Sequence, residues 1–255
     1  MNSFIVGMIA FLCTFGGVLL GMLLRSVLRE HHLTDRSEGS VKVAIGLIAM
    51  MTALVLGLIT ASAKSSFDSV NTAVKQSATQ VLALDRALAR YGPETAEIRT
   101  ALKQMLGTRI DMIWPQGSIR PVNLDPMSSG ALWAGEKLAE GIRNLKPHNE
   151  SQQALKSRAL DLTETVMQTR WFVLAGSENS VPLPFLVVLL FWLTVIFMSF
   201  GVFSEPNTIV IAALFVCALS IGAALFLVLE LDKPFDGVLR VSADPMRYAY
   251  KHLNQ

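Results

Sequence analysis

The chain has 255 residues, is 52% hydrophobic and only 16% charged, and carries a formal net charge of +2. So small a net charge disfavours nucleic acid as a partner, and the apolar bias indicates a membrane protein. Both cysteines, Cys13 and Cys217, lie in long apolar segments. We therefore expect no disulfide in an extramembrane domain, and cysteine usage does not indicate the redox compartment.

Four apolar segments predict four membrane-spanning helices, because about 20 apolar residues cross the ~30 Å hydrocarbon core. No Asp, Glu, Lys, Arg or His lies inside them, which argues against a proton relay or an ion-coupled pump. The first segment lacks a basic n-region and a cleavage site, so we interpret it as a retained helix rather than a signal peptide. The four spans are Phe4–Leu24, Val43–Ala63, about Val181–Phe203 and Thr208–Leu229.

A polar helical region separates spans two and three. No Gly or Pro occurs from Lys64 to Tyr91, so span two is expected to continue outward as one helix until Gly92-Pro93 ends it. Apolar residues spaced alternately by three and four predict a heptad seam on this helix, with one polar interruption at Ser77. The seam comprises Phe67, Val70, Val74, Ser77, Val81, Leu84 and Leu88.

Three more helices are predicted before span three. One covers 94–113, one is capped by Asp125 and ends near Pro147, and one runs from about Ser151 to Ala175 with its own heptad-like seam. Antiparallel packing of the two heptad helices would cover both seams, and we interpret these stripes as core rather than as a cofactor site. The sequence thus predicts an all-α fold with membrane helices in 1–63 and 181–229, a helical domain in 64–180 and a tail in 230–255.

Four spans place both termini and the middle domain on one side of the membrane. The positive-inside rule does not separate the two orientations, because the first loop and the tail each offer four basic residues. Lys64, Lys75 and Arg170 favour a cytoplasmic middle domain.

No catalytic or metal-binding motif is present, so we expect neither an enzyme nor a bound cofactor. The pair His31-His32 is interpreted as solvated loop histidines rather than metal ligands. Glu230, Asp232 and Asp236 offer carboxylates for a cation, but the interpretation we favour is a solvated turn.

Small residues repeat at four-residue spacing within the spans and allow helices to approach closely, within one subunit or between subunits. The pairs are Gly17 with Gly21, Gly57 with Ala61, and Ala218 with Gly222.

Span two also carries Thr52, Leu56, Thr60 and Lys64 along one ridge at four-residue spacing. Hydroxyl groups ending in a lysine suit an anion pore with a cation at its mouth. The alternative is that the threonines bond to their own backbone while Lys64 snorkels to the membrane interface.

Several ordered strings along nearly the whole chain resemble the bestrophin-like bacterial membrane proteins, a family without assigned function. Those in the first half are Gly46-Leu47-Ile48-Ala49, Ala61-Ser62-Ala63-Lys64-Ser65-Ser66-Phe67, Leu84-Asp85-Arg86 and Tyr91-Gly92-Pro93-Glu94. Those in the second half are Pro184-Phe185-Leu186-Val187-Val188, Phe200-Gly201, Leu229-Glu230-Leu231-Asp232 and Pro234-Phe235.

The resemblance has a more remote link to bestrophins, which are pentameric anion channels with four membrane helices per subunit and cytosolic termini. It implies a homo-oligomer in the bacterial inner membrane, permeable to chloride or another anion, with span two lining the pore at Thr52, Leu56, Thr60 and Lys64. Structural or oligomer roles are expected for Gly17, Gly21, Gly57, Asp85, Arg86, Asp232, Pro234 and Phe235. The chain departs from bestrophins in having no aromatic residue between Val43 and Ala63 and no acidic calcium-binding run.

Two hypotheses follow. The first is a bestrophin-like anion channel, and the alternative is a non-conducting, membrane-anchored helical scaffold or sensor that binds a protein partner. For Asp85 and Arg86 we expect pairing with a neighbouring subunit or with Arg99 and Glu97, or else an exposed charged flank of little energetic weight.

Overall fold

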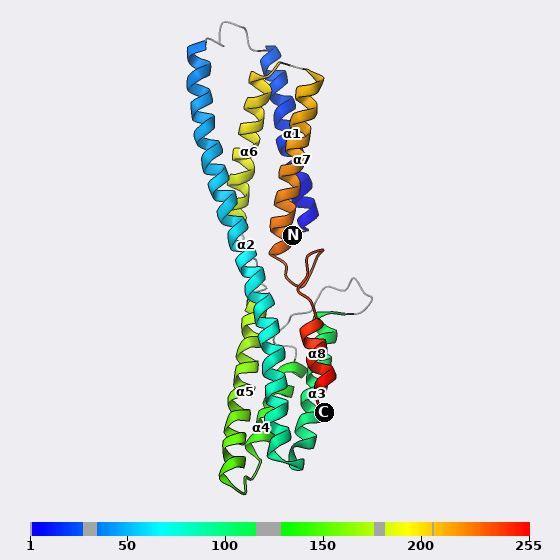
Figure 1. The fold of residues 1–255 in the computed structure, drawn as a ribbon. Coiled ribbons are helices and arrows are strands. Elements are labelled where there is room, and N and C mark those ends of the chain that lie inside the picture. The colour runs from blue at the N-terminus through cyan, green and yellow to red at the C-terminus, as the bar shows by residue number, and fades with distance from the viewer. Residues whose placement is uncertain (1, 28–34, 116–128, 176–181, 206) are drawn as a thin grey trace. The chain divides into compact units, whose positions relative to one another are not determined.

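The computed structural model describes residues 2–27, 35–115, 129–175, 182–205 and 207–255. The described residues form helices and no strand, so the predicted all-α fold is confirmed (Figure 1). The chain divides into two compact units, one formed by Met1–Ser65 with Asn179–Asp232 and the other by Ser66–Glu178 with Lys233–Gln255. His31, His32, Asp125 and Pro126 lie outside the described residues.

Among the residues that the structure describes, four helices are long and apolar enough to cross a membrane, and their apolar parts lie in the first unit. They are α1 (Ser3–Val27), the first part of α2 (Asp35–Tyr91), α6 (Leu183–Phe203) and α7 (Thr208–Leu231), each within a few residues of a predicted span. The helix α2 continues unbroken from the membrane unit into the second unit. Because no Gly or Pro interrupts Lys64–Tyr91, this continuity is what the sequence predicts.

Glycines bring α1 against both helices of the C-terminal hairpin. A Cβ on Gly21 would strike the backbone oxygen of Met198 on α6, and one on Gly17 would lie 2.9 Å from the backbone oxygen of Thr194. Gly7 and Gly222 make the equivalent contact between α1 and α7. The Gly17–Gly21 pair therefore packs within one chain, whereas nothing lies within 4 Å of the position of a Cβ on Gly57.

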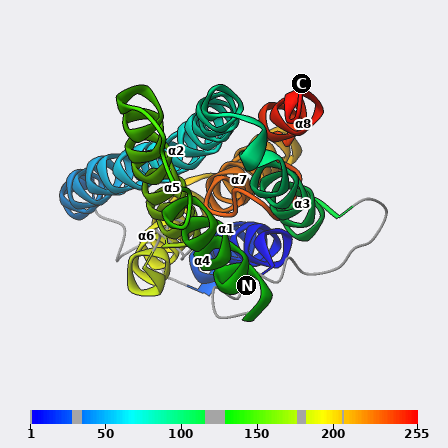
Figure 2. The same ribbon diagram turned by 90° about the horizontal axis from the view of Figure 1, so that it is seen from below.

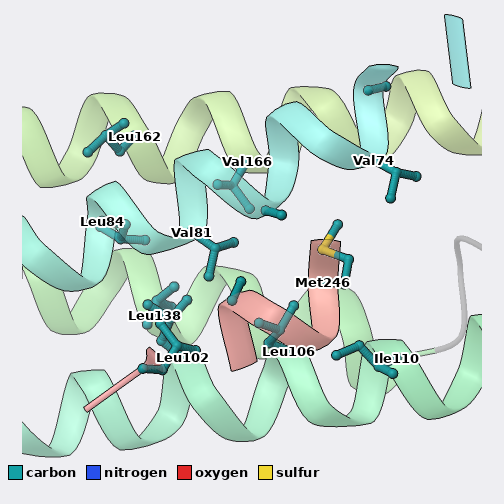
Figure 3. Packing of buried hydrophobic residues seen from close by; sticks show 14 of the residues in the cluster. Val74, Val81, Leu84, Leu102, Leu106, Ile110, Leu138, Leu162, Val166 and Met246 are labelled. Atoms are coloured by element: carbon teal, nitrogen blue, oxygen red, sulfur yellow. The ribbon is translucent and has the colours of Figure 1, made fainter. Parts of the chain in front are cut away.

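The second unit is a helical bundle around one apolar core. It contains the second part of α2, the short 3-10 helix η2 (Pro93–Thr95), α3 (Ala96–Ile113), α4 (Ser129–Arg143), α5 (Glu150–Ala175) and α8 (Asp244–His252). Figure 3 shows Leu162 and Val166 of α5 near Leu84 and Val81 of α2, and all four belong to the same buried cluster.

Two hydrogen bonds fix the direction of packing in this bundle. Gln152 Nε2 donates to the Tyr91 carbonyl at 3.0 Å, and Thr169 Oγ1 donates to Gln80 Oε1 at 3.2 Å. Residue numbers rise along α5 as they fall along α2, so the predicted antiparallel pairing of the two heptad helices is confirmed.

The segment after α7, which the sequence predicted to be a tail, forms part of the helical bundle. Its helix α8 lies beside α3 (Figures 1 and 2) and places Met246, Ala249 and Leu253 in the bundle core. Val241 anchors the start of this segment, because its amide donates to the Pro234 carbonyl at 2.8 Å and its carbonyl accepts from Trp114 Nε1 at 2.9 Å. The sequence placed 230–255 in a separate tail. In the structure, Lys233–Gln255 belongs to the same unit as the helical bundle.

Ser77, the polar residue of the heptad seam, is fully buried, and its Oγ has no hydrogen-bond partner among the described residues. Because a buried hydroxyl without a partner is unfavourable, Ser77→Ala is expected to raise the free energy of unfolding by about 1 kcal/mol. Thermal unfolding of the purified protein measures this change. Ser69→Ala, at an exposed position of the same helix, serves as the control and should shift the midpoint little. A lower midpoint for Ser77→Ala would contradict the assignment.

Candidate functional site

Of the four membrane helices, α2 is the least covered by its own chain. Only 6% of its apolar window is buried, against 39% for α1, 28% for α6 and 17% for α7. One side of α2 is therefore open to lipid or to another copy of the protein.

The predicted ridge on span two does not lie on this open side as a whole. Thr52 is only 4% exposed and Leu56 is half-buried, whereas Thr60 and Lys64 are exposed. The reason is geometric, since eight residues of an α-helix turn the side chain by about 80° relative to its start. Within this chain Thr52 and Leu56 are therefore covered by other residues, and the pore-lining roles predicted for the ridge stay predictions.

Both threonine hydroxyls bond to their own helix. Thr52 Oγ1 donates to the Ile48 carbonyl and Thr60 Oγ1 donates to the Leu56 carbonyl, each at 2.7 Å. This is the arrangement that the alternative interpretation of the ridge predicted. The hydroxyl oxygen of the exposed Thr60 remains a polar group on the open side.

The open side of α2 has two flanks of different chemistry. At 100° per residue, one flank groups small, hydroxyl or cationic residues and the other groups large apolar ones. The first, which we call the small-residue flank, comprises the exposed residues Gly46, Ala53, Gly57, Thr60 and Lys64. The second, the bulky flank, comprises Leu47, Met51, Leu54 and Leu58, which are 54–74% exposed.

The acidic residues at the end of α7 and just beyond it differ from the solvated turn that we favoured. Glu230 and Asp232 are buried, at 4% and 7% exposure, and only Asp236 is exposed. The described residues contain no group of three His, Cys, Asp or Glu side chains arranged to hold a metal ion. Pro234 and Phe235 are also buried, and the Phe235 ring meets Trp114 edge-on at 5.8 Å between centroids.

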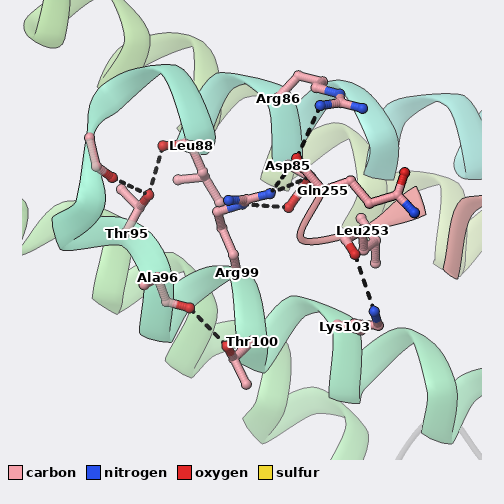
Figure 4. A network of polar contacts seen from close by, with 11 residues as sticks. Asp85, Arg86, Leu88, Thr95, Ala96, Arg99, Thr100, Lys103, Leu253 and Gln255 are labelled. Atoms are coloured by element: carbon pink, nitrogen blue, oxygen red, sulfur yellow. Dashed lines mark hydrogen bonds and ion pairs between the residues drawn. The ribbon is translucent and has the colours of Figure 1, made fainter. Parts of the chain in front are cut away.

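A buried ion pair joins α2 to α3 in the bundle (Figure 4). Arg99 donates from Nε to Asp85 Oδ1 at 2.7 Å and from Nη2 to Asp85 Oδ2 at 3.0 Å. The Asp85 side chain is 1% exposed and that of Arg99 is 18% exposed. The hydrogen bond to Asp85 raises the pKa of Arg99 above its ordinary value, so the guanidinium stays charged. Of the arrangements expected for Asp85, pairing with Arg99 is the observed one, and an exposed flank is excluded.

Three basic residues hold the end of the chain next to this ion pair. Arg86 and Arg99 donate to the Gln255 carbonyl at 3.2 and 3.3 Å, and Lys103 donates to the Leu253 carbonyl at 3.1 Å (Figure 4). We call these three residues the basic clamp. The sequence-based predictions missed the roles of Lys103 and Trp114. The available signal was Asp244-Pro245 followed by apolar positions at 246, 249 and 253, a helix start with an apolar face.

A second buried polar group lies where α2 ends. The Tyr91 hydroxyl has no hydrogen-bond partner among the described residues. Burial, and then the nearby charge of Glu94, raise the pKa of the Tyr91 phenol above its ordinary value.

These features define an all-α, multi-pass membrane protein with a helical domain inserted between two pairs of membrane helices. A family model described as the Bestrophin-like domain matches residues 12–246, which is most of the chain. The protein therefore belongs to the bestrophin-like family. No curated protein and no solved structure matches the chain.

Proposed function

We propose that the protein is an anion-permeable channel of the bacterial inner membrane, formed by several copies whose α2 helices surround the pore. The observation that carries this proposal is the small-residue flank of the least covered membrane helix. A helix side that faces only lipid gains by presenting large apolar groups, as the bulky flank does. A flank of Gly, Ala and Thr that ends in Lys64 instead leaves space and places a cation where anions such as chloride would enter.

The proposal revises the pore lining that the sequence suggested. The residues assigned to the pore are Gly46, Ala53, Gly57, Thr60 and Lys64, and Thr52 and Leu56 face the subunit interior. The family supports the proposal through its more remote link to bestrophins. We further propose that the helical bundle and both termini are cytoplasmic, on the basis of the positive charges of Lys64, Lys75 and Arg170.

The Lys64→Glu variant tests the pore assignment. Replacing a cation at the mouth by an anion should repel permeant anions, so the chloride-to-sodium permeability ratio is expected to fall about tenfold or more. Reversal potentials of the reconstituted protein in planar bilayers under a salt gradient measure this ratio. Arg90→Glu, at an exposed position near the end of α2, is the matched control and should leave the ratio nearly unchanged. A reversal potential that Lys64→Glu does not shift would remove Lys64 from the pore.

A second candidate function is the non-conducting scaffold or sensor. It is favoured by the size of the bundle, which has an apolar core separate from those of the membrane unit. Absence of anion flux from liposomes that contain an intact oligomer would favour this candidate. A soluble fragment made to measure partner binding needs residues 233–255 as well as 66–178, because α8 completes the core.

A further inference from the structure

Two apolar side chains are exposed at the tip of the loop that joins α7 to α8, residues 232–243. Val238 is 80% exposed and Leu239 is 37% exposed. The loop is anchored on both sides of this tip, because Phe235 and Val241 are buried in the bundle core at 3% and 2% exposure. Single exposed apolar residues are common on proteins, so the position and the rigidity of this tip decide what it does.

Gly237 gives the loop its sharp turn. Its φ of 97° lies in the left-handed region that glycine adopts at little cost. Arg240 Nε donates to the Gly237 carbonyl at 2.6 Å, and the Val241 amide donates to the Pro234 carbonyl at 2.8 Å. Hydrogen bonds thus close the loop at its tip and at its base, and the two apolar side chains project from a defined turn.

The level of this loop along α2 follows from the packing of α3. The two helices run in opposite directions from the turn between them, and Arg99 on α3 pairs with Asp85 on α2. Trp114 lies fifteen residues further along α3, and the residue fifteen positions earlier on α2 is Val70. Trp114 is therefore near the level of Val70. Since Trp114 Nε1 donates to the Val241 carbonyl at 2.9 Å, the base of the loop lies at that level too.

Val70 lies close to the membrane surface. The apolar segment of α2 ends at Ala63, and seven residues of helix at 1.5 Å each place Val70 about 10 Å beyond it. The headgroup region extends about 5–8 Å beyond each side of the hydrocarbon core, so the base of the loop lies near the outer edge of that region. The chain leads to the same level from the other side, because α7 ends at Leu231, four residues before Phe235.

The large aliphatic side chains that the bundle unit exposes gather at this end. Among its described residues they are Val238, Leu239 and Met112, and Met112 precedes Trp114 by two residues on α3. Figure 1 shows the loop beyond the first turn of α8, at the end of the bundle where α2 enters it. None of the described residues near the turn between α2 and α3 exposes such a side chain. The distribution distinguishes the end next to the membrane from the end far from it.

We propose that Val238 and Leu239 insert into the surface of the bilayer beside the spanning helices, with Met112 at the edge of the contact. The tip is three residues from Val241, which span up to about 10 Å, so it can reach the lipid from the base of the loop. Apolar groups at a bilayer surface are buried about 5–10 Å into the boundary between headgroups and acyl chains. The contact would remove the exposed apolar surface from water, and it does not rest on the proposed channel activity.

Fluorescence of the labelled full chain in lipid nanodiscs tests the proposal. A background with Cys13→Ala and Cys217→Ala leaves Val238→Cys, an exposed position, as the single site for the environment-sensitive label NBD. In nanodiscs of phosphatidylcholine and phosphatidylglycerol, the label should emit at a shorter wavelength than in water. It should lose about half of its intensity or more when the lipids carry a nitroxide near the headgroup. Arg90→Cys, exposed near the far end of α2, is the matched control and should stay unquenched.

Emission at the wavelength found in water, without quenching by the nitroxide lipid, would overturn the proposal. A shift to shorter wavelength without such quenching would identify a protein surface, such as a second copy of the chain, as the partner and would overturn the lipid assignment. If the background variant does not fold, a photoreactive diazirine amino acid in place of Val238 in the otherwise unchanged chain decides the matter. Crosslinks to lipid are expected, and their absence would contradict the insertion.

Discussion

Replacing Asp85 with leucine is expected to lower the free energy of unfolding by about 3 kcal/mol, because it leaves the Arg99 charge without its buried partner. The value lies at the low end of the range for such pairs, since Arg99 remains 18% exposed and keeps its bond to the Gln255 carbonyl. Thermal unfolding of the purified full chain measures the loss. Because Arg99 also holds the end of the chain, hydrogen exchange of α8 should become faster in the same variant.

The double variant Asp85→Leu with Arg99→Met distinguishes the effect of the uncompensated charge from the effect of altered side-chain packing. It removes the uncompensated charge, so it should recover most of the stability that the single change loses. Glu97→Ala, an exposed acid on the same helix as Arg99, is the control and should change stability by less than about 1 kcal/mol. A double variant as unstable as Asp85→Leu would show that the site depends on something other than the ion pair.

Much of this fold follows from patterns that are local in sequence. Apolar length predicted the four spans, and the absence of Gly and Pro predicted that α2 continues beyond the membrane. The heptad spacing indicated the seam on α2 and the seam on α5. These predictions succeeded because each depends on a run of neighbouring residues.

The partners of individual side chains were harder to predict. Gly17 and Gly21 mark a face for close approach, but nothing in their spacing says that α6 of the same chain fills it. The Asp85 side chain was considered for an exposed flank because Leu84 beside it faces the seam, yet α3 and the end of the chain cover it. Both cases depend on contacts between segments far apart in sequence.

The candidate pore face of α2 was also difficult to predict from residue spacing alone. A spacing of four residues places neighbours close together, but over 52, 56, 60 and 64 the side chains drift around the helix. In the structure Thr52, at one end of this ridge, is buried, whereas Lys64, at the other end, is exposed. Helix geometry groups Thr60 and Lys64 with Gly46, Ala53 and Gly57, and the structure adds that this side of α2 is exposed.

Substitution of Gly21 by alanine is expected to destabilise the membrane helices by about 2 kcal/mol, because the added methyl group meets backbone rather than a movable side chain. Its Cβ would strike the Met198 carbonyl and lie 3.0 Å from the Gly201 Cα, so α1 and α6 must separate. The thermal unfolding midpoint in detergent measures this effect.

Gly16→Ala provides a matched control for Gly21→Ala on the same helix. Nothing lies within 4 Å of the position of its Cβ, so the substitution adds a methyl group without a clash. Because alanine favours helix by up to about 1 kcal/mol relative to glycine, Gly16→Ala should be neutral or stabilising. Opposite signs for the two variants would show that close approach of α1 and α6 requires a glycine at position 21. Equal midpoints would instead mean that the two helices can move apart at little cost, and the small-residue contact would then not fix their packing.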